Sequence, residues 1–386
     1  MIELSILEKL NVPEREARLG NLRAIAEKTA FPPRDQRYIN NHIHTTFSFS
    51  PYSPTAAVYA AAAEGLCTAG IVDHDTMAGA REFLEAAKIL KMPVTVGMEC
   101  RVSLADTPFE NRRLNNPDQT GVAYMTIQSV PHGRIEDMTE FFAPYRARRE
   151  ARNRRMLSRL AELLPEYAPD YDRDVLPLTM QAAGGTVTER HLLFALARNM
   201  TVKLGRGEKI ASVLEGNGVE LSEKQREKLL SDSGFFYEYD LLGILKSAFL
   251  PRIYLPATDE CPTLAAVMEK CREVDAFLCY AYLGDIAESV TGDKRAQKFE
   301  DDILEELFSF LKKNGVNAVT YMPTRNTAEQ LRRLRSLCEE YGMFQISGED
   351  INSPSQSFVI RAMEDPQFAN LIDATWALIE HENKEV

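Results

Sequence analysis

Long apolar runs are missing from this sequence of 386 residues. No stretch approaches the roughly 20 consecutive apolar residues that a membrane span needs, and the first segment, MIELSILEKLNVPERE, carries acidic residues early. The sequence therefore predicts neither a transmembrane helix nor a signal peptide. Hydrophobic residues make up 45% of the chain and charged residues 26%, a balance that favours a globular protein of the cytoplasm.

Cysteine and positive charge are both scarce. The six cysteines are scattered and none forms a C-x-x-C pair, which indicates a reducing compartment rather than a disulfide framework. The formal net charge is -12. Such a chain repels duplex nucleic acid at long range, so we expect no extended duplex as a partner. A local basic patch can still hold a small phosphate.

Strand-like and helix-like segments alternate near the start of the chain and again near its end. This alternation is typical of a parallel sheet covered by helices, and it predicts an α/β barrel. In such barrels the chemistry lies at the carboxyl ends of the strands. The expected strands cover residues 38–44, 68–72, 93–96, 276–280, 318–321 and 343–346, and the expected helices residues 55–66, 79–90, 263–274, 301–313 and 327–341.

The middle of the chain has a different character. Charged, helix-like segments dominate there, and we expect an inserted helical subdomain between two parts of one barrel. A helical lead-in precedes the barrel, and a capping helix follows Asp365. The predicted organisation is residues 1–37 for the lead-in, 38–132 for the first part of the barrel, 133–250 for the insertion, and 251–386 for the second part of the barrel with the C-terminal helix.

His42 and His44 are separated by one residue, and side chains at positions i and i+2 of a strand point to the same side. Two imidazoles about 7 Å apart along a strand can converge on one cation. Imidazole is a common ligand of zinc, manganese and iron. The alternative is a pair of exposed histidines on a surface strand. Three of the six histidines follow two neighbouring strands beside acidic residues, so we favour a metal site.

Further polar residues follow the other predicted strands. Asp73 and His74 follow the second strand, Glu99 follows the third, and Asp350 follows the last, which in a closed barrel returns next to the first. Asp73 can instead cap the helix after it, and a lone glutamate after a strand is weak evidence. Together these residues form a mixed nitrogen and oxygen donor set that leaves positions open for water and substrate.

Four segments carry a family resemblance. HIHTTFSFSPYSP, GIVDHDT, VGMEC and ISGEDINSP resemble motifs of the PHP (polymerase and histidinol phosphatase) superfamily, and the resemblance covers roughly residues 38–104 and 263–355. It implies a distorted (β/α)7 TIM-like PHP barrel with up to three metal ions, in proteins that mostly hydrolyse phosphoesters. The resemblance thus gives the predicted α/β fold a specific form.

The resemblance also implies which residues bind metal. His42, His44, Glu99 and Asp350 would form one complete site, and His74 would belong to a second site that has lost its partners. We therefore expect one divalent metal ion, zinc, manganese or iron, and at most two. The departures from the family pattern are Phe49 in place of an acidic ligand, Tyr282 and Asn352 in place of histidines, and Tyr124 or Met125 near a further lost histidine, for which His132 is a distant substitute.

Phosphate needs positive charge, and three residues are candidates for substrate binding. The segment GGTVTERHLLFALARNM resembles the G-R-P-H segment of the nucleotide-hydrolysing PHP branch, so His191 matches its histidine and Arg190 lies beside it. Arg325 follows the strand at residues 318–321. A further row of arginines recurs at helical spacing, and we interpret most of it as a solvated face paired with nearby glutamates. The alternative for one or two of them is a place in the cleft between the insertion and the barrel. The row consists of Arg148, Arg152, Arg155 and Arg159.

Two functions fit these patterns. The first is a metal-dependent hydrolase of phosphoesters that uses a metal-activated water on a small phosphorylated metabolite, a nucleotide or an oligonucleotide end. Asp73 or His74 would orient the water or protonate the leaving group. The alternative is a degenerate PHP-fold protein that binds a metal or ligand without catalysis. Hydrolysis of a non-phosphate bond is a third possibility. The retained donor set favours the enzyme, and the lost positions favour the alternative.

Overall fold

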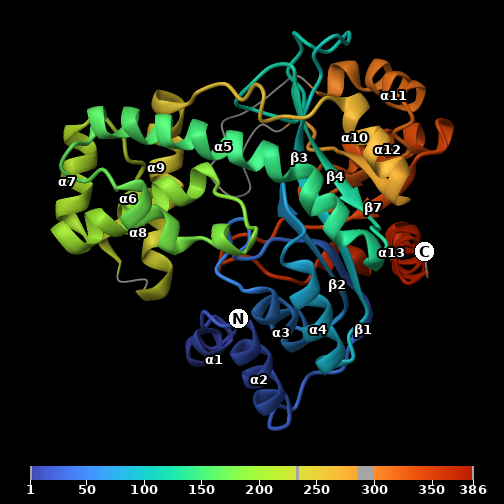
Figure 1. Ribbon diagram of the computed structural model, residues 1–386, viewed down its shortest axis with the longest axis horizontal. Coiled ribbons are helices and arrows are strands. Elements are labelled where there is room, and N and C mark those ends of the chain that lie inside the picture. Colours follow the sequence, from blue (N-terminus) through green and yellow to red (C-terminus); the bar gives the residue numbers. More distant parts are fainter. Residues whose placement is uncertain (1, 232–233, 286–299, 385–386) are drawn as a thin grey trace.

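Seven strands form one sheet in the computed structural model, which describes residues 2–231, 234–285 and 300–384 (Figure 1). Neighbouring strands are hydrogen-bonded in the order in which they occur in the chain. The strands are β1 (Asp35–Ile43), β2 (Leu66–His74), β3 (Val94–Ser103), β4 (Val122–Gln128), β5 (Phe277–Ala281), β6 (Ala318–Tyr321) and β7 (Phe344–Ser347).

The sheet curves into a nearly closed barrel. Past the end of β7, Ile351 forms a parallel bridge with Ile43 of β1, and the Ile351 N–H donates to the carbonyl of His42 (3.1 Å). The predicted α/β barrel is thereby confirmed, but the sheet is mixed rather than parallel, because β4 runs antiparallel to both β3 and β5. Residues 104–121 join β3 to β4 without a helix, whereas parallel neighbours are usually joined by a helical crossover.

Helices cover the outside of the barrel, and polar caps mark where several of them begin. The side chains of Ser53, Thr263 and Thr327 each accept a backbone N–H from the residue three positions later. Apolar faces of these helices pack on the strands to form the main core. The helices are α3 (Pro54–Ala63), α4 (Ala80–Leu90), α10 (Leu264–Val274), α11 (Leu304–Lys313), α12 (Ala328–Glu340) and α13 (Ala369–Glu382).

Two helices precede the barrel and pack against α3 and α4. They are α1 (Leu4–Leu10) and α2 (Arg15–Ala26). The buried guanidinium of Arg18 on α2 donates to both carboxylate oxygens of Glu82 on α4, at 2.8 and 2.5 Å. This two-bond pair fixes the lead-in against the barrel, since a planar guanidinium matches a carboxylate in only a narrow range of orientations.

Between β4 and β5 the chain builds a helical insertion with an apolar core of its own (Figure 1). Helix α5 belongs to both cores, because Met138 and Phe142 lie in the barrel core whereas Met156 and Leu160 lie in the insertion core. A single long helix therefore joins the two parts. The helices of the insertion are α5 (Ile135–Leu163), α6 (Glu189–Leu204), α7 (Glu208–Gly216), α8 (Glu223–Leu230) and α9 (Tyr237–Ile253).

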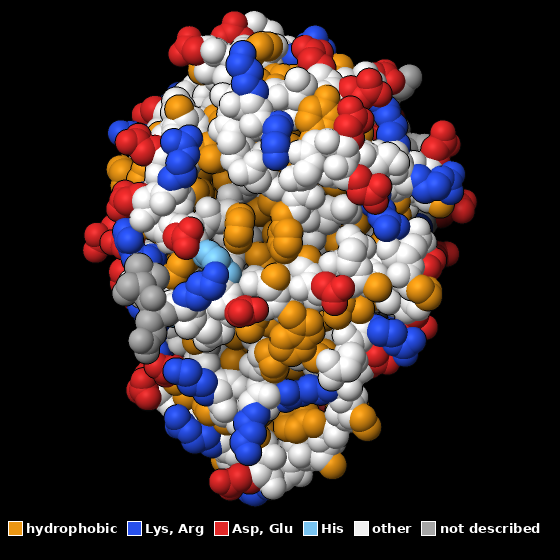
Figure 2. Space-filling model, turned by 90° about the vertical axis from the view of Figure 1, so that its right-hand side faces the viewer, with side chains coloured by type: hydrophobic (Ala, Val, Ile, Leu, Met, Phe, Trp, Pro, Cys, Tyr) orange, Lys and Arg blue, Asp and Glu red, His pale blue; other side chains and the backbone are white. Residues whose placement is uncertain are grey.

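Charged side chains of both signs are scattered over the face turned to the viewer in Figure 2, so the net negative charge is not gathered into one patch there. All six cysteines are buried free thiols. Among the described residues, no helix combines the length and apolar character needed to cross a bilayer. Short one-turn helices complete the fold: His132–Arg134, Tyr171–Val175, Leu176–Leu178, Gln181–Ala183, Gly234–Phe236, Asp301–Ile303, Arg361–Glu364 and Pro366–Phe368.

Candidate metal centre

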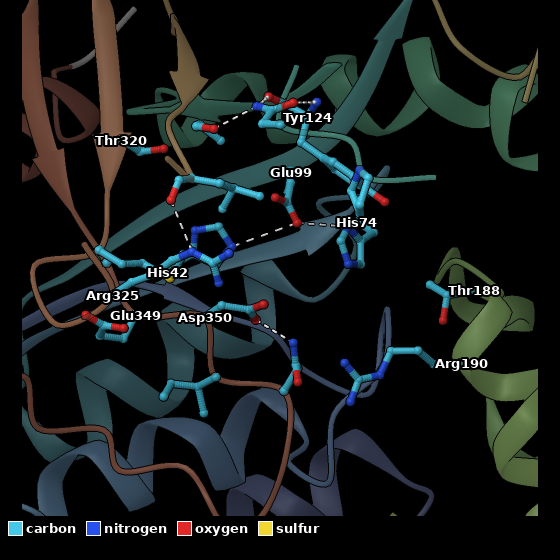
Figure 3. Close-up of a pocket in the computed structure, with 18 of the residues that line it drawn as sticks. His42, His74, Glu99, Tyr124, Thr188, Arg190, Thr320, Arg325, Glu349 and Asp350 are labelled. Atoms are coloured by element: carbon cyan, nitrogen blue, oxygen red, sulfur yellow. Dashed lines mark hydrogen bonds and ion pairs between the residues drawn. The ribbon is translucent and has the colours of Figure 1, made fainter. Parts of the chain in front are cut away.

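Five donor side chains meet at the mouth of the barrel, and Figure 3 shows four of them, His42, His74, Glu99 and Asp350. His42 lies near the end of β1 and His44 just beyond it, while His74 ends β2 and is paired in register with Glu99 of β3. Asp350 reaches β1 because the bridge at the next residue holds the segment after β7 there. Segments that are about 300 residues apart in the sequence thus converge, as the motif pattern predicts.

Glu99 lies among three imidazoles. Its Oε2 atom is 3.8 Å from His42 Nε2, 3.7 Å from His44 Nε2 and 3.1 Å from His74 Nδ1. Asp350 Oδ1 lies 3.3 Å from His44 Nε2. Within 4.8 Å of one another, donor atoms form two overlapping groups, one of His42, His44 and Asp350 and one of His44, His74 and Glu99. The geometry therefore offers two adjacent cation positions that share His44.

The hydrogen bonds behind His44 determine which of its nitrogens carries the proton. Ser48 Oγ donates its proton to Asp73 Oδ1 (2.6 Å), which leaves the oxygen lone pairs of Ser48 to accept from His44 Nδ1 (3.4 Å) in the tautomer that carries its proton there. His44 Nε2 then presents a lone pair to Glu99 and Asp350. It is buried and has no hydrogen-bond partner among the described residues. A lone pair facing two carboxylates calls for a cation between them, so these residues fit a divalent metal ion.

The pKa values at this centre also favour positive charge at His44 Nε2, where a proton takes the place of the cation when no metal is bound. Burial lowers the pKa of His44, but the carboxylates of Asp350 and Glu99 outweigh it and raise that pKa above its ordinary value. Burial raises the pKa of Glu99, yet the surrounding imidazoles of His74, His42 and His44 bring it down to about 2. The carboxylate is therefore ionised, and the space between it and His44 favours positive charge.

Asp73 faces away from the metal centre, which corrects its predicted catalytic role. Neighbouring residues of a strand point to opposite sides, so Asp73 and His74 cannot both face the cavity. The Asp73 carboxylate accepts hydrogen bonds from the Thr45 N–H, from Thr45 Oγ1 and from Ser48 Oγ, each at 2.6 Å. Asp73 therefore fixes the loop after β1 and, through Ser48, the imidazole of His44.

A cavity of about 490 Å³ opens beside the donor set, between the mouth of the barrel and the insertion. Its volume is typical of sites for small molecules. His42, His74, Glu99 and Asp350 line one side. Arg190, from the first turn of α6, and Arg325, from the segment after β6, line the cavity from opposite parts of the fold, as Figure 3 shows. Two of the predicted phosphate-binding residues thus lie where a substrate would bind.

His191 lies outside the cavity lining, which corrects the prediction that it binds substrate. Its side chain is buried in the first turn of α6, where His191 Nδ1 accepts the Thr188 N–H (3.0 Å) in a capping box. The ring also packs edge-on against Phe49. Burial and the nearby arginines lower its pKa to about 3, so the imidazole is neutral and brings no charge to a phosphate.

A buried network of ion pairs forms the other side of the cavity, and sequence reasoning missed it. Arg149 Nη1 donates to Asp75 Oδ2 and Arg149 Nη2 to Glu189 Oε2, both at 2.6 Å. Arg152 bonds to Glu189 and also to Glu260 (2.6 Å). Arg152 is therefore an exception to the solvated face expected for most of its row, and its partners are 37 and 108 residues away in the sequence rather than on the same helix. Arg101 of β3 joins the network through Glu260.

The residues that replace family ligands have other partners. Phe49 packs in the insertion core, and the hydroxyl of Tyr282 donates to Asp301 (2.6 Å). Asn352 Nδ2 donates to Asp350 Oδ1 (2.6 Å), so it supports a donor rather than acting as one. Tyr124 lines the cavity with its ring centre 6.4 Å from that of His74. His132 lies near Glu382, outside the cavity lining.

Comparisons with known proteins identify the class. The fold and donor set define an α/β barrel with a candidate metal centre. The model of the PHP domain matches residues 40–188, from β1 to the residue before α6. The resemblance to this family that was found in the sequence is thereby confirmed over residues 40–188. No curated protein matches the chain.

Two solved structures share the fold. A provisionally named metal-dependent phosphoesterase from Bifidobacterium adolescentis aligns with a TM-score of 0.55 and 19% identity, over 88% of this chain and 98% of its own. An amidohydrolase from Chromobacterium violaceum, whose structure holds sulfate and no metal, aligns with a TM-score of 0.53 and 15% identity, over 84% of this chain and 90% of its own. At such identities these likenesses establish the fold alone.

Proposed function

We propose that this protein is a metal-dependent hydrolase of phosphoesters that acts on small phosphorylated molecules. The observation that carries the proposal is the buried lone pair of His44 Nε2, which faces the carboxylates of Glu99 and Asp350 beside an open cavity. When bound, a divalent ion supplies a water of lowered pKa and polarises a phosphoryl oxygen. Zinc, manganese and iron all suit a donor set of imidazoles and carboxylates.

The charged residues of the cavity support a phosphoester as the substrate. Arg190 and Arg325 bring guanidinium groups from the insertion and from the barrel, and such groups match the oxygens of a phosphate. They flank a donor set that is negatively charged without a cation. The metal ion and the two arginines together would balance a phosphate dianion, and the cavity volume suits a metabolite or a nucleotide rather than a folded polymer.

His74 is the residue to which we assign proton transfer or orientation of the attacking water. Its ring faces the cavity, and burial lowers its pKa to about 3 despite the nearby Glu99 carboxylate. A neutral imidazole of this kind can accept a proton or hold a water molecule. His74 also belongs to the second candidate metal group, so metal binding and proton transfer make different predictions for its removal.

Elemental analysis of the purified protein and a panel of small phosphoesters with added manganese or zinc test the proposal. We expect at least one metal ion per chain and turnover of a phosphomonoester or phosphodiester. In His74→Ala, turnover should be abolished while metal remains at His42, His44 and Asp350. Unchanged turnover in this variant would exclude the assigned role, and loss of metal would assign His74 as a ligand.

The second candidate is a PHP-fold protein that binds a metal or ligand without catalysis. It is favoured by Phe49 and Tyr282, which stand at family ligand positions and are engaged in packing and in a hydrogen bond to Asp301. Full metal occupancy together with no turnover across monoesters, diesters and amides would support it. Metal-dependent turnover of any of these substrates would reject it.

A further inference from the structure

Arg149 of α5 lies between the barrel and the insertion, and its guanidinium bonds to a carboxylate on each side. Nη1 donates to Asp75 in the loop after β2, and Nη2 donates to Glu189 at the first position of α6. Arg149 is 4% exposed and Asp75 is 5% exposed. Both contacts are therefore shielded from water, where charge-assisted hydrogen bonds between well-matched groups are strong.

The barrel side of this link adjoins the metal centre. Asp75 directly follows His74, and its backbone has a left-handed φ of 54°. The Asp75 N–H donates to the carbonyl of Glu99 (2.8 Å), and its own carbonyl accepts from Arg146 (2.9 Å). With the side chain held by Arg149, the residue is fixed at three points. The position of His74 is thus tied to α5 through Asp75.

The insertion side of the link is part of the substrate-binding wall. Glu189 accepts hydrogen bonds from Arg149 and Arg152, and Arg101 lies 3.7 Å away. The next residue, Arg190, lines the cavity. One guanidinium therefore spans from the residue after His74 to the residue before Arg190.

We propose that Arg149 is a positioning residue, which sets Arg190 at a fixed place relative to the metal centre. This inference rests on the proposed function, because it takes Arg190 to be a ligand of the substrate phosphate. The planar guanidinium can bond Asp75 and Glu189 at the same time from two different nitrogens, whereas the single ammonium of a lysine is a point charge. The insertion then forms a preset wall of the cavity and Arg149 acts on substrate only through Arg190.

Substitution of Arg149 should make the start of α6 more mobile relative to the barrel, but should not detach the insertion from it. The segment before α6 is also tied to the barrel by the Thr186 N–H, which donates to the carbonyl of Phe47 (2.7 Å), and by Thr76 Oγ1, which donates to the carbonyl of Gly184 (2.7 Å). We therefore expect Arg149→Lys to fold. Asp75→Asn is a second variant that weakens only the barrel side of the link.

The test measures binding of inorganic phosphate to the manganese-loaded protein by calorimetry, for the wild type, Arg149→Lys, Arg190→Ala and the double variant. Arg149→Lys should weaken phosphate binding on the order of tenfold and leave manganese binding within about twofold, with no further loss in the Arg190→Ala background. Asp75→Asn should behave like Arg149→Lys. Arg155→Gln, an exposed change on the same helix, serves as the matched control and should bind phosphate like the wild type.

Three results would overturn the inference. The first is independent, additive losses from Arg149→Lys and Arg190→Ala, which indicate that Arg149 does not act through Arg190. The second is unchanged phosphate binding in Arg149→Lys or Asp75→Asn, and the third is no phosphate binding by the manganese-loaded wild type. If the wild type binds phosphate with the predicted coupling but hydrolyses no phosphoester, the proposed function fails and the positioning role stands. Where a phosphoester is turned over, Arg149→Lys should raise KM more than it lowers kcat.

Discussion

The two walls of the cavity differ in whether their charged and polar groups are paired with one another. On the barrel wall, Glu99 and Asp350 face imidazole nitrogens, and the buried His44 Nε2 has no hydrogen-bond partner among the described residues. On the insertion wall, the carboxylate of Glu189 is bonded by two arginines, and so is that of Glu260, which lies outside the cavity lining but shares Arg152 with Glu189. A wall whose polar groups lack partners until a cation binds is suited to catalysis. A wall whose charged groups form ion pairs with one another is suited to fixing the shape of the cavity.

The largest effect should follow from removing the donor that both candidate metal groups share. His44→Ala leaves no complete group, so we expect the divalent metal to be lost and turnover to fall on the order of a thousandfold, equivalent to about 4 kcal/mol. Elemental analysis and steady-state kinetics measure the two effects. A chelator should lower the melting temperature of the wild type but leave that of the variant unchanged, since only the wild type gains stability from bound metal. If His44→Ala kept its metal and its turnover, the claim that the barrel wall differs from the insertion wall in needing a cation would be wrong.

The second effect belongs to the insertion wall and should appear in stability rather than in metal content. Glu260→Gln leaves Arg101 and Arg152 buried with one carboxylate fewer, which should lower the free energy of unfolding by about 3 kcal/mol. Urea unfolding measures this change. Glu305→Gln is the control, because Glu305 is exposed and its ion pair with Arg333 should contribute less than about 1 kcal/mol. If Glu260→Gln removes metal but leaves stability unchanged, the assignment of roles to the walls is wrong.

The third effect is a dependence of stability on pH that arises in the insertion. The pKa of His191 is about 3 in the folded protein, where burial disfavours the charged form, and near 6.5 in the unfolded chain. As the pH falls, His191 therefore binds a proton in the unfolded state before it does so in the folded state. The contribution of the neutral His191 to stability is lost as the pH falls from 6.5 towards 3. The expected loss is about 2 kcal/mol between pH 7 and pH 5.

The variant His191→Gln isolates this contribution. Glutamine at the same position keeps the capping box with Thr188, because its amide oxygen can accept the same N–H, and it does not titrate. The free energy of unfolding is measured in urea at pH 5 and at pH 7. Its change between the two pH values should be smaller in this variant than in the wild type, by about 2 kcal/mol. An equal pH dependence in both proteins would contradict the buried, neutral state of His191.

Sequence reasoning found the donors of the barrel wall because each of them is marked by its position within or after a strand. The spacing of His42 and His44 places both on one side of a strand, and the alternation of strands and helices places Glu99 and Asp350 at the same end of the barrel. Neither β4 nor its reversal was predicted, because residues 104–121 contain no helix that would mark the connection between two strands.

The insertion wall could not be predicted from spacing. A row of arginines on one helix does not reveal which members are buried, and the acids that bury Arg149 and Arg152 lie on other elements, 37 to 108 residues away. The prediction for His191 failed for a related reason. A matching motif position says that a histidine is present, but the hydrogen bond from the Thr188 N–H decides what the ring can still do.

The smallest effect concerns Asp73, which lies behind the barrel wall. Like the carboxylates of the insertion wall, it has hydrogen-bond partners within the protein. Asp73→Asn puts an amide nitrogen where three donors now meet one carboxylate, so Ser48 should no longer be fixed as an acceptor for His44 Nδ1. Because partners behind a ligand orient it and set its basicity, we expect metal affinity to fall about tenfold while some turnover remains at saturating metal. Calorimetric titration with manganese measures the change. A loss of turnover that excess metal does not restore would instead place Asp73 in the chemistry itself.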